Sequence, residues 1–507
     1  MNISRRFFIA GAASYGAFAG NRFFAVAAPN ALPTGQPRLT FGVVSDIHIT
    51  RVGAGEKQEA WGNNLTFRHT LEWFRSQGVD AVMVVGDMAD NGMVEQMQAV
   101  ANAWYAVFPE DKMPDGRPVE KLFVMGNHDY HGYLYGGHAE KLYADENERR
   151  KHILRADMAG WWRRIFNEDY SRFYRKVVKG YTFLGTHWDD GKGPETRYGS
   201  ETFGVELGAF LSKHGRAFDP AQPFFYFQHP HPKDTCYGSW AWGHDRGLTT
   251  KALSPFANAI AFSGHSHYTL TDERSIWQGA FTSVGTSSLR YTGMPYNARH
   301  PFGYENTITE QGTKTLSRAD IDAMKMMGQD SGGDCRQGML WKVYDDCIVI
   351  QRREFLNDVF VGPDWVMPLP AAESKPFAFA EHAKKTVTPE FPKGAKVVLA
   401  KIKGKTRATQ GHPAVEKEAY KLTFPAALAA PGVRPFEYEI IAVGKDGTRA
   451  DFHVVAEGFN HALSHKRATA NSSCTISIDR LPADTVSFEV RPLDCFWRKG
   501  APLTVSV

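Results

Sequence analysis

Between Leu39 and Ser263, short apolar runs alternate with longer amphipathic stretches. Each short run ends at a polar or glycine-rich turn, and the runs cover residues 39–45, 81–86, 121–125, 181–186, 223–228 and 259–263. Residues 64–77 and 94–107 place apolar side chains at near-helical spacing. Strand-length and helix-length patterns in alternation predict a layered α/β domain.

The chain has 507 residues, which is too long for one ordinary hydrophobic core, so we expect two domains. We assign the α/β domain to residues 38–362, after a short mature N-terminal segment, 28–37. From Pro363 the composition shifts, and repeated prolines predict a linker over 363–395. Short alternating runs separated by turns then predict a smaller β-sandwich of the immunoglobulin or fibronectin type over 396–507.

The N-terminus has the features of an export signal. Arg5 and Arg6 precede an apolar, small-residue stretch without an acidic residue, and residues 25–27 (Ala-Val-Ala) offer a small-x-small cleavage site. Residues 1–27 resemble a twin-arginine signal peptide, which predicts a periplasmic or secreted protein that meets the twin-arginine translocase during export. The alternative is a membrane anchor. A span needs about 20 apolar residues, and this run is short and is interrupted at Asn21 and Arg22.

The net charge of the mature chain argues against nucleic acids and anionic membranes as partners. Cleavage removes Arg5, Arg6 and Arg22 and no acid, which lowers the formal charge from +4 to +1. Much of the basic character therefore belongs to the signal, and the mature chain predicts no nucleic-acid polymer or anionic membrane as its main partner.

In an oxidising compartment the cysteines could be either disulfide-bonded or free. Cys335 could pair with Cys347, and Cys474 with Cys495, since the periplasm tolerates disulfides. Free buried thiols are the alternative that we prefer, because spacing alone does not establish a bridge.

Acids, histidines and one asparagine follow five of the predicted strands in a fixed order. These motifs are D-I-H at 46–48, G-D-M-A-D-N-G at 86–92, G-N-H-D at 126–129, a single His229, and G-H-S-H at 264–267. A lone histidine is more often a core or surface residue than a ligand. Five such motifs, each at the carboxyl end of a strand, coincide with the place where open α/β sheets position their sites. Together they predict a metal site.

This order of motifs resembles the calcineurin-like metallophosphoesterase family over about residues 39–355. The resemblance implies a four-layer α/β/β/α sandwich whose two metal ions share a hydroxide that attacks a phosphate ester. It implies that Asp46, His48 and His267 hold one metal, that Asn127, His229 and His265 hold the other, and that Asp87 bridges them. This oxygen and imidazole set suits Mn, Fe, Zn or Co.

Two further residues have implied catalytic roles. His128, beside Asn127, resembles the general acid that protonates the leaving group. Asp90 matches the acid that orients this histidine in some members, whereas a cap on the following helix is the alternative.

Several neighbouring residues remain open. His231 competes with His229 as the ligand, although His229 ends its strand directly. Other possible contacts to substrate or to ligands are His187, His244, Asp245, Arg246 and Arg290. Trp161, Trp162, Trp188, Trp240 and Trp242 could stack a base or sugar, or could simply pack a core.

The substrate is less constrained than the reaction. Protein phosphatases of this family typically carry arginine where this chain has Asn91, so we expect a small or envelope-derived phosphoester. Phosphodiesterase or nucleotidase selectivity on the same site is an alternative. A non-catalytic envelope binding protein with a structural metal is the alternative from another class.

Overall fold

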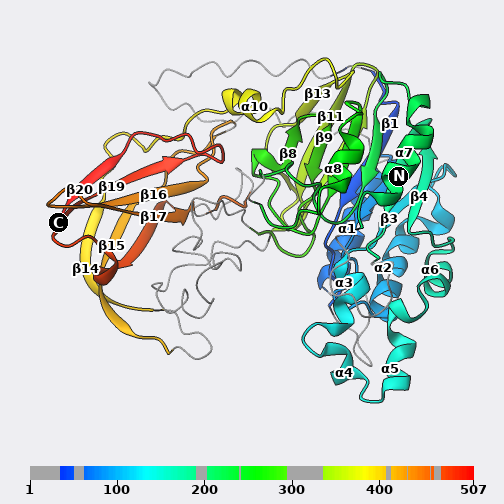
Figure 1. The fold of residues 1–507 in the computed structure, drawn as a ribbon, viewed down its shortest axis with the longest axis horizontal. Coiled ribbons are helices and arrows are strands. Elements are labelled where there is room, and N and C mark those ends of the chain that lie inside the picture. Colours follow the sequence, from blue (N-terminus) through cyan, green and yellow to red (C-terminus); the bar gives the residue numbers. More distant parts are fainter. Residues whose placement is uncertain are drawn as a thin grey trace, which may run out of the picture. The chain divides into compact units, whose positions relative to one another are not determined.

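Two mixed sheets form the first part of the chain, shown in Figure 1. In the first sheet, β1 (Leu39–Val44), β2 (Ala81–Val85) and β3 (Glu120–Val124) are parallel neighbours. The antiparallel strands β10 (Gln337–Val343), β11 (Cys347–Glu354) and β12 (Val359–Phe360) extend it beyond β1. The carboxyl ends of β1, β2 and β3 therefore lie at one edge.

The second sheet has the order β4-β5-β6-β7-β9-β8. Its members are β4 (Phe173–Val178), β5 (Tyr181–Thr186), β6 (Phe224–Phe227), β7 (Ala259–Ser263), β8 (Ile276–Gln278) and β9 (Thr282–Gly285). The four strands β5, β6, β7 and β9 run parallel. This sheet also collects several carboxyl ends at one edge.

Helices cover the outer faces of both sheets. Apolar side chains of α1 (Gly62–Ser76), α2 (Val94–Val107) and α6 (Met158–Phe166) pack with those of the first sheet. Those of α7 (Val205–His214) and α8 (Leu248–Leu253) pack with the second sheet. A third core, in which Phe41 contacts Phe183 and Trp341, joins the inner faces of the two sheets. The predicted α/β/β/α sandwich is confirmed.

The structure describes residues 33, 35–50, 62–189, 202–238, 241–293, 335–406, 413–430, 432–456, 458–461 and 470–507. The predicted signal peptide, 1–27, lies outside them. Three short helices, α3 (Asn127–His131), α4 (His138–Leu142) and α5 (Glu146–His152), lie in the long insertion that follows β3. Within the described part of the chain, no helix is long and apolar enough to span a bilayer.

The stretch predicted as a linker, 363–395, differs from that expectation. Its first part forms β13 (Trp365–Pro368), which pairs with β11, and Trp365 is buried in the core between the sheets. A later part forms α10 (Phe379–Lys385). Proline content misled the prediction because Pro368 lies at the end of a short edge strand, where proline is tolerated.

Two smaller sheets follow. One contains β14 (Val398–Lys405), β15 (Glu416–Pro425) and β18 (Asn471–Ser477). The other contains β16 (Glu437–Gly444), β17 (Arg449–Val455), β19 (Thr485–Leu493) and β20 (Leu503–Ser506). Side chains such as Leu422, Ile440 and Phe488 form their shared core, so the predicted all-β region is confirmed. All five cysteines are free thiols.

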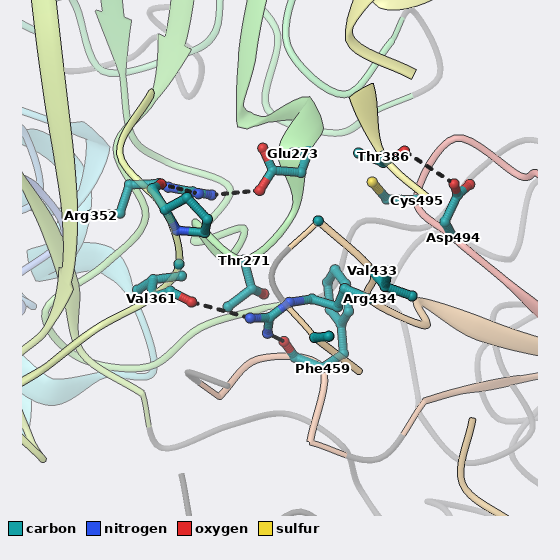
Figure 2. A pocket seen from close by; sticks show the side chains of 14 residues that line it. Thr271, Glu273, Arg352, Val361, Thr386, Val433, Arg434, Phe459, Asp494 and Cys495 are labelled. Carbon is teal, nitrogen blue, oxygen red and sulfur yellow. Dashed lines mark hydrogen bonds and ion pairs between the residues drawn. The ribbon is translucent and has the colours of Figure 1, made fainter. Parts of the chain in front are cut away.

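A pocket lies where residues of the β-rich region meet the first two sheets (Figure 2). Arg434 donates to the carbonyl oxygens of Val361 (3.1 Å) and Phe459 (3.0 Å). Arg352 donates to Glu273 at 2.9 Å. The guanidinium groups of Arg434 and Arg352 are thus already hydrogen-bonded to protein oxygens. This is expected of polar groups that are buried where secondary-structure elements pack together.

Candidate metal centre

The predicted ligands gather where the carboxyl ends of the two sheets meet. Asp46 and His48 follow β1, and Asp87 follows β2; the two loops run side by side, because Asp46 N–H donates to Gly86 O and His48 N–H to Asp87 O, both at 2.9 Å. His229 follows β6, and its carbonyl oxygen accepts from Gly264 N–H, which fixes the start of the loop after β7. Parallel strand ends thus deliver the motifs to one place.

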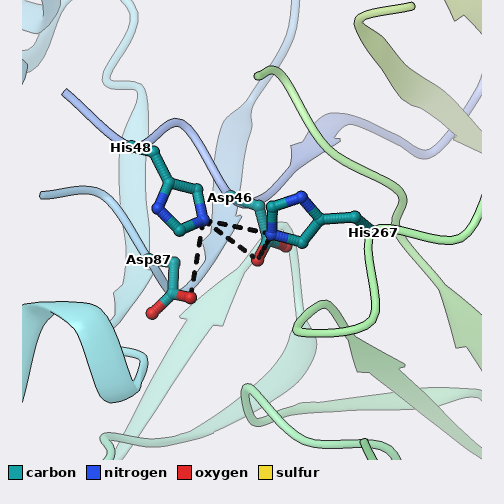
Figure 3. Close-up of side chains that lie close together, drawn as sticks. All are labelled: Asp46, His48, Asp87 and His267. Atoms are coloured by element: carbon teal, nitrogen blue, oxygen red, sulfur yellow. Dashed lines mark hydrogen bonds and ion pairs between the residues drawn. The ribbon is translucent and has the colours of Figure 1, made fainter. Parts of the chain in front are cut away.

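Four side chains form a first group, shown in Figure 3: Asp46, His48, Asp87 and His267. His267 Nε2 lies 3.0 Å from Asp46 Oδ1 and 3.1 Å from His48 Nε2. His48 Nε2 also lies 3.6 Å from Asp87 Oδ2. All four are buried.

A second group consists of Asp87, His229 and His265. His229 Nε2 lies 3.0 Å from Asp87 Oδ2. Asn127 belongs to the adjoining turn, whose next residue, His128, donates its N–H to Asp87 Oδ1 at 2.8 Å. Asp87 is therefore common to both groups.

Three of the histidines are held by the ring nitrogen that faces away from the cluster. His48 Nδ1 lies 2.9 Å from Asp90 Oδ1, His229 Nδ1 lies 2.7 Å from Val85 O, and His267 Nδ1 lies 3.2 Å from Tyr291 O. An acceptor on Nδ1 selects the tautomer whose Nε2 lone pair is free to bind a metal.

Unsatisfied polar atoms indicate that the cluster fits metal ions. The buried atoms of the described part of the chain that form no hydrogen bond include Asp46 Oδ1, Asn127 Oδ1 and His229 Nε2, although Asp46 Oδ1 and His229 Nε2 each lie 3.0 Å from an atom of another predicted ligand. Buried polar atoms are almost always paired in proteins, so an orphaned set at one point needs a ligand. Carboxylate, amide and imidazole donors suit borderline transition metals.

The charges of the cluster agree with this fit. Burial would raise the pKa of Asp46 and of Asp87, yet the neighbouring histidines hold both pKa values well below the usual range. Burial would lower the pKa of His48 and of His229, yet the carboxylates raise each to about 9. The acids are thus ionised, and a metal ion would take the place of the protons that the two histidines hold beside them.

The backbone of these loops is unusual. Most of the predicted ligands have a left-handed backbone, namely Asp46 (φ 52°), His48 (49°), Asp87 (50°), His265 (69°) and His267 (55°). Asp and His enter this region more readily than most residues, although at an energetic cost.

Glycines let the loops approach one another. A Cβ atom at Gly126 would lie 2.1 Å from Asp87 Oδ1, and one at Gly264 would lie 2.5 Å from Asp46 Oδ2. Only glycine permits this spacing.

Asp129 is a residue of this region whose role the sequence did not reveal. Its buried carboxylate accepts the N–H groups of Ala89 (2.6 Å), Gly126 (2.8 Å) and Met88 (3.2 Å). Burial, followed by the charge of Asp87, raises the pKa of Asp129 to about 7, against the opposing effect of these donors. One side chain thus joins the loop that carries Asp87 to the loop that carries Asn127. Its position in the G-N-H-D motif was the only signal.

Asp90 contacts three neighbours of the cluster. Its carboxylate binds His48 and also Arg290, and its carbonyl oxygen accepts from His128 Nδ1 at 2.7 Å. It does not cap α2, which begins at Val94 after Met93 at the N-cap. The capping alternative is therefore excluded, and Asp90 contacts His48 and His128.

His231 is engaged at both ring nitrogens, by Ser263 Oγ at 2.5 Å and by Ser266 Oγ at 2.7 Å. Neither nitrogen is left for a metal, so the geometry favours His229 over His231. His187 Nδ1 accepts from Met125 N–H at 3.1 Å and supports the loop before Asn127.

Several of the other residues that the sequence suggested as possible contacts to substrate or ligands have partners of their own. Asp245 accepts from Gln228 Nε2 at 2.9 Å and from Lys233 N–H at 3.1 Å, and His244 lies 3.3 Å from Cys236 O. Arg246 is exposed. Trp162 is buried and Trp161 partly buried in the core beneath α6, whereas Trp240 lies outside the described residues.

Most contacts of the loop after β9 with the candidate metal centre could not be predicted from the sequence. Ser288 Oγ donates to Asp46 O at 3.1 Å, Leu289 N–H donates to Ser45 O at 3.1 Å, and Gly293 N–H donates to His267 O at 2.7 Å. The sequence had indicated only Arg290 in this loop. Small polar residues that bind backbone atoms carry no pattern of their own.

The fold and the cluster define a phosphoester hydrolase whose buried acids and histidines fit two metal ions. Residues 39–269, which contain all five motifs, match the family model of calcineurin-like phosphoesterases. Over these residues the chain is similar to calcineurin-like phosphoesterases.

Solved structures with a similar fold are distant in sequence. A dimetal phosphatase from Danio rerio is 13% identical, with 66% of this chain and 99% of that chain covered and a TM-score of 0.34. A purple acid phosphatase from yellow lupin (Lupinus luteus) is 11% identical, with 65% of this chain and 54% of that chain covered and a TM-score of 0.37. No curated protein matches the chain.

Proposed function

We propose that this chain hydrolyses small phosphate esters with two metal ions held side by side. The observation that carries the proposal is that Asp87 belongs to both groups of buried ligands. One ion would be held by Asp46, His48 and His267, the other by Asn127, His229 and His265, with the Asp87 carboxylate between them. Two such ions acidify a shared water and neutralise charge on the phosphoryl oxygens.

His128 is the proposed proton donor to the leaving oxygen. Its Nδ1 is fixed on Asp90 O at 2.7 Å, so Nε2 is the atom available to a substrate. The backbone N–H of the same residue holds Asp87, which ties the donor to the ligand that both ions would share. Arg290, held by Asp90, is placed to pair with a phosphoryl oxygen.

Replacing His128 by alanine tests the reaction and the role together. We expect the variant to keep its metals and to lose rate by about 10²-fold on an alkyl phosphate, because a poor leaving group needs the proton. On p-nitrophenyl phosphate, whose leaving group needs no proton, the loss should be small. The assay compares both monoesters, bis-p-nitrophenyl phosphate and a nucleotide panel, with metal content measured in each sample.

Two results would reject parts of this proposal. An unchanged rate on the alkyl ester would reject His128 as the donor. Two bound metals without hydrolysis of any monoester, diester or nucleotide would instead favour the non-catalytic binding protein.

We also propose that the protein is exported by the twin-arginine route and acts in the periplasm or outside the cell. The support is Arg5 and Arg6 before an apolar stretch and the Ala-Val-Ala sequence at 25–27. Changing both arginines to lysine should retain the protein in the cytoplasm, as measured by fractionation and N-terminal sequencing. Unaltered export of this double variant would reject the route.

A further inference from the structure

An exposed indole lies against the candidate metal centre. Trp242 is 42% exposed, and its ring stacks on the His265 imidazole at 4.4 Å with 23° between the planes. Among the tryptophans that the structure describes, it alone is exposed. Exposing the apolar surface of an indole to water is unfavourable, so the exposed position of Trp242 beside the predicted metal ligand His265 needs a physical reason.

Packing around His265 does not supply that reason. The buried ring of Trp188 already contacts the same imidazole at 5.6 Å and His229 at 6.0 Å. Trp242 therefore adds a second aromatic wall, with one face against His265 and much of its remaining surface in solvent.

A similar arrangement borders the first ligand group. Tyr291 is 49% exposed, and its ring lies 4.5 Å from that of His267. The Arg290 guanidinium lies 5.8 Å from the Tyr291 ring. Each of the two groups thus has an exposed aromatic ring on one of its histidines, and a cation lies near the Tyr291 ring.

We propose that Trp242 is a stacking platform for a planar ring in the alcohol part of the substrate, with Tyr291 beside the other ligand group. The preferred substrate class is then a phosphate ester whose leaving alcohol carries an aromatic ring or a nucleobase. This inference rests on the proposed function. Ligand sites combine a few polar groups with aromatic walls, and an offset ring pair adds affinity beyond the area it buries.

Benzyl phosphate and cyclohexylmethyl phosphate test the ring directly. Their alcohols are similar in size and in leaving-group basicity, but only benzyl has a planar face. We expect the protein to have a KM about tenfold lower for benzyl phosphate. Trp242→Leu should abolish that preference by raising the KM for benzyl phosphate to that for cyclohexylmethyl phosphate. Trp242→Phe should restore most of it.

Two controls separate this inference from the proposed function. Phe360→Leu removes an exposed ring of β12 (48% exposed) and should alter neither KM. Binding of benzylphosphonate and cyclohexylmethylphosphonate, which cannot be hydrolysed at the ester position, reads the ring preference without turnover.

The outcomes are distinguishable. A preference for the benzyl ligand that disappears in Trp242→Leu supports the platform, even where no ester is hydrolysed and the proposed function fails. Equal binding of both phosphonates, or a benzyl preference that survives in Trp242→Leu, overturns it.

Discussion

Replacing Asp87 by asparagine should lower kcat/KM for a phosphate monoester by about 10³-fold or more. The amide has nearly the same shape as the carboxylate but carries no negative charge. It therefore cannot neutralise two cations at once, and it leaves His48 and His229 beside a neutral group. Metal analysis should show that the variant retains less metal than the parent protein.

Asp80→Asn is the matched control for this experiment. Asp80 is also a buried acid, at the opposite end of β2, where it accepts from Thr40 N–H at 2.9 Å and from Arg117 at 3.3 Å. Its replacement should leave the rate within about twofold, because surface and distant sites act independently of the centre. Full metal content and more than a tenth of the rate in Asp87→Asn would contradict the bridging assignment.

Replacing Asp129 by alanine should produce the largest loss of stability. Three backbone N–H groups, of Met88, Ala89 and Gly126, lose their acceptor inside the protein. Each buried unsatisfied donor costs about 1–3 kcal/mol, so the free energy of unfolding should fall by about 3–9 kcal/mol. Urea unfolding monitored by tryptophan fluorescence measures this change.

Asp129→Asn separates positioning from charge. The amide oxygen still accepts hydrogen bonds, so this variant should recover much of the stability and of the metal affinity that the alanine variant loses. Identical unfolding curves for parent and alanine variant would show that water or a local shift satisfies the three donors, and Asp129 would then have no positioning role.

The features that could be predicted from the sequence are those that require a particular order of apolar and polar side chains. Buried strands with both faces covered give continuous apolar runs, as in β1, and parallel strands end at a common edge. The motifs at 46–48, 86–92, 126–129 and 264–267 could therefore be predicted to meet at one place from the sequence alone. Glycine spacing added the information that the loops approach closely.

Other features had no such signal. The role of Asp129 depends on backbone N–H groups from two loops, and every residue except proline has such a group. The contact of Ser288 with Asp46 depends on where a loop some 240 positions away returns. The pairing of β13 was hidden by Pro368 and by the prolines that flank this strand, and the geometry that favours His229 over His231 depends on the serines around His231.

The left-handed backbone at five predicted ligands limits how this chain could change its metal. Glutamate and cysteine are also good ligands, but they lack the tolerance for this conformation that aspartate, asparagine and histidine share. An exchange of ligand type at Asp46, His48, Asp87, His265 or His267 would therefore meet a backbone penalty before any gain in coordination. Adaptation to another ion is easier through Asn127 and His229, which are not among the residues with positive φ, or through the acceptors behind the histidines.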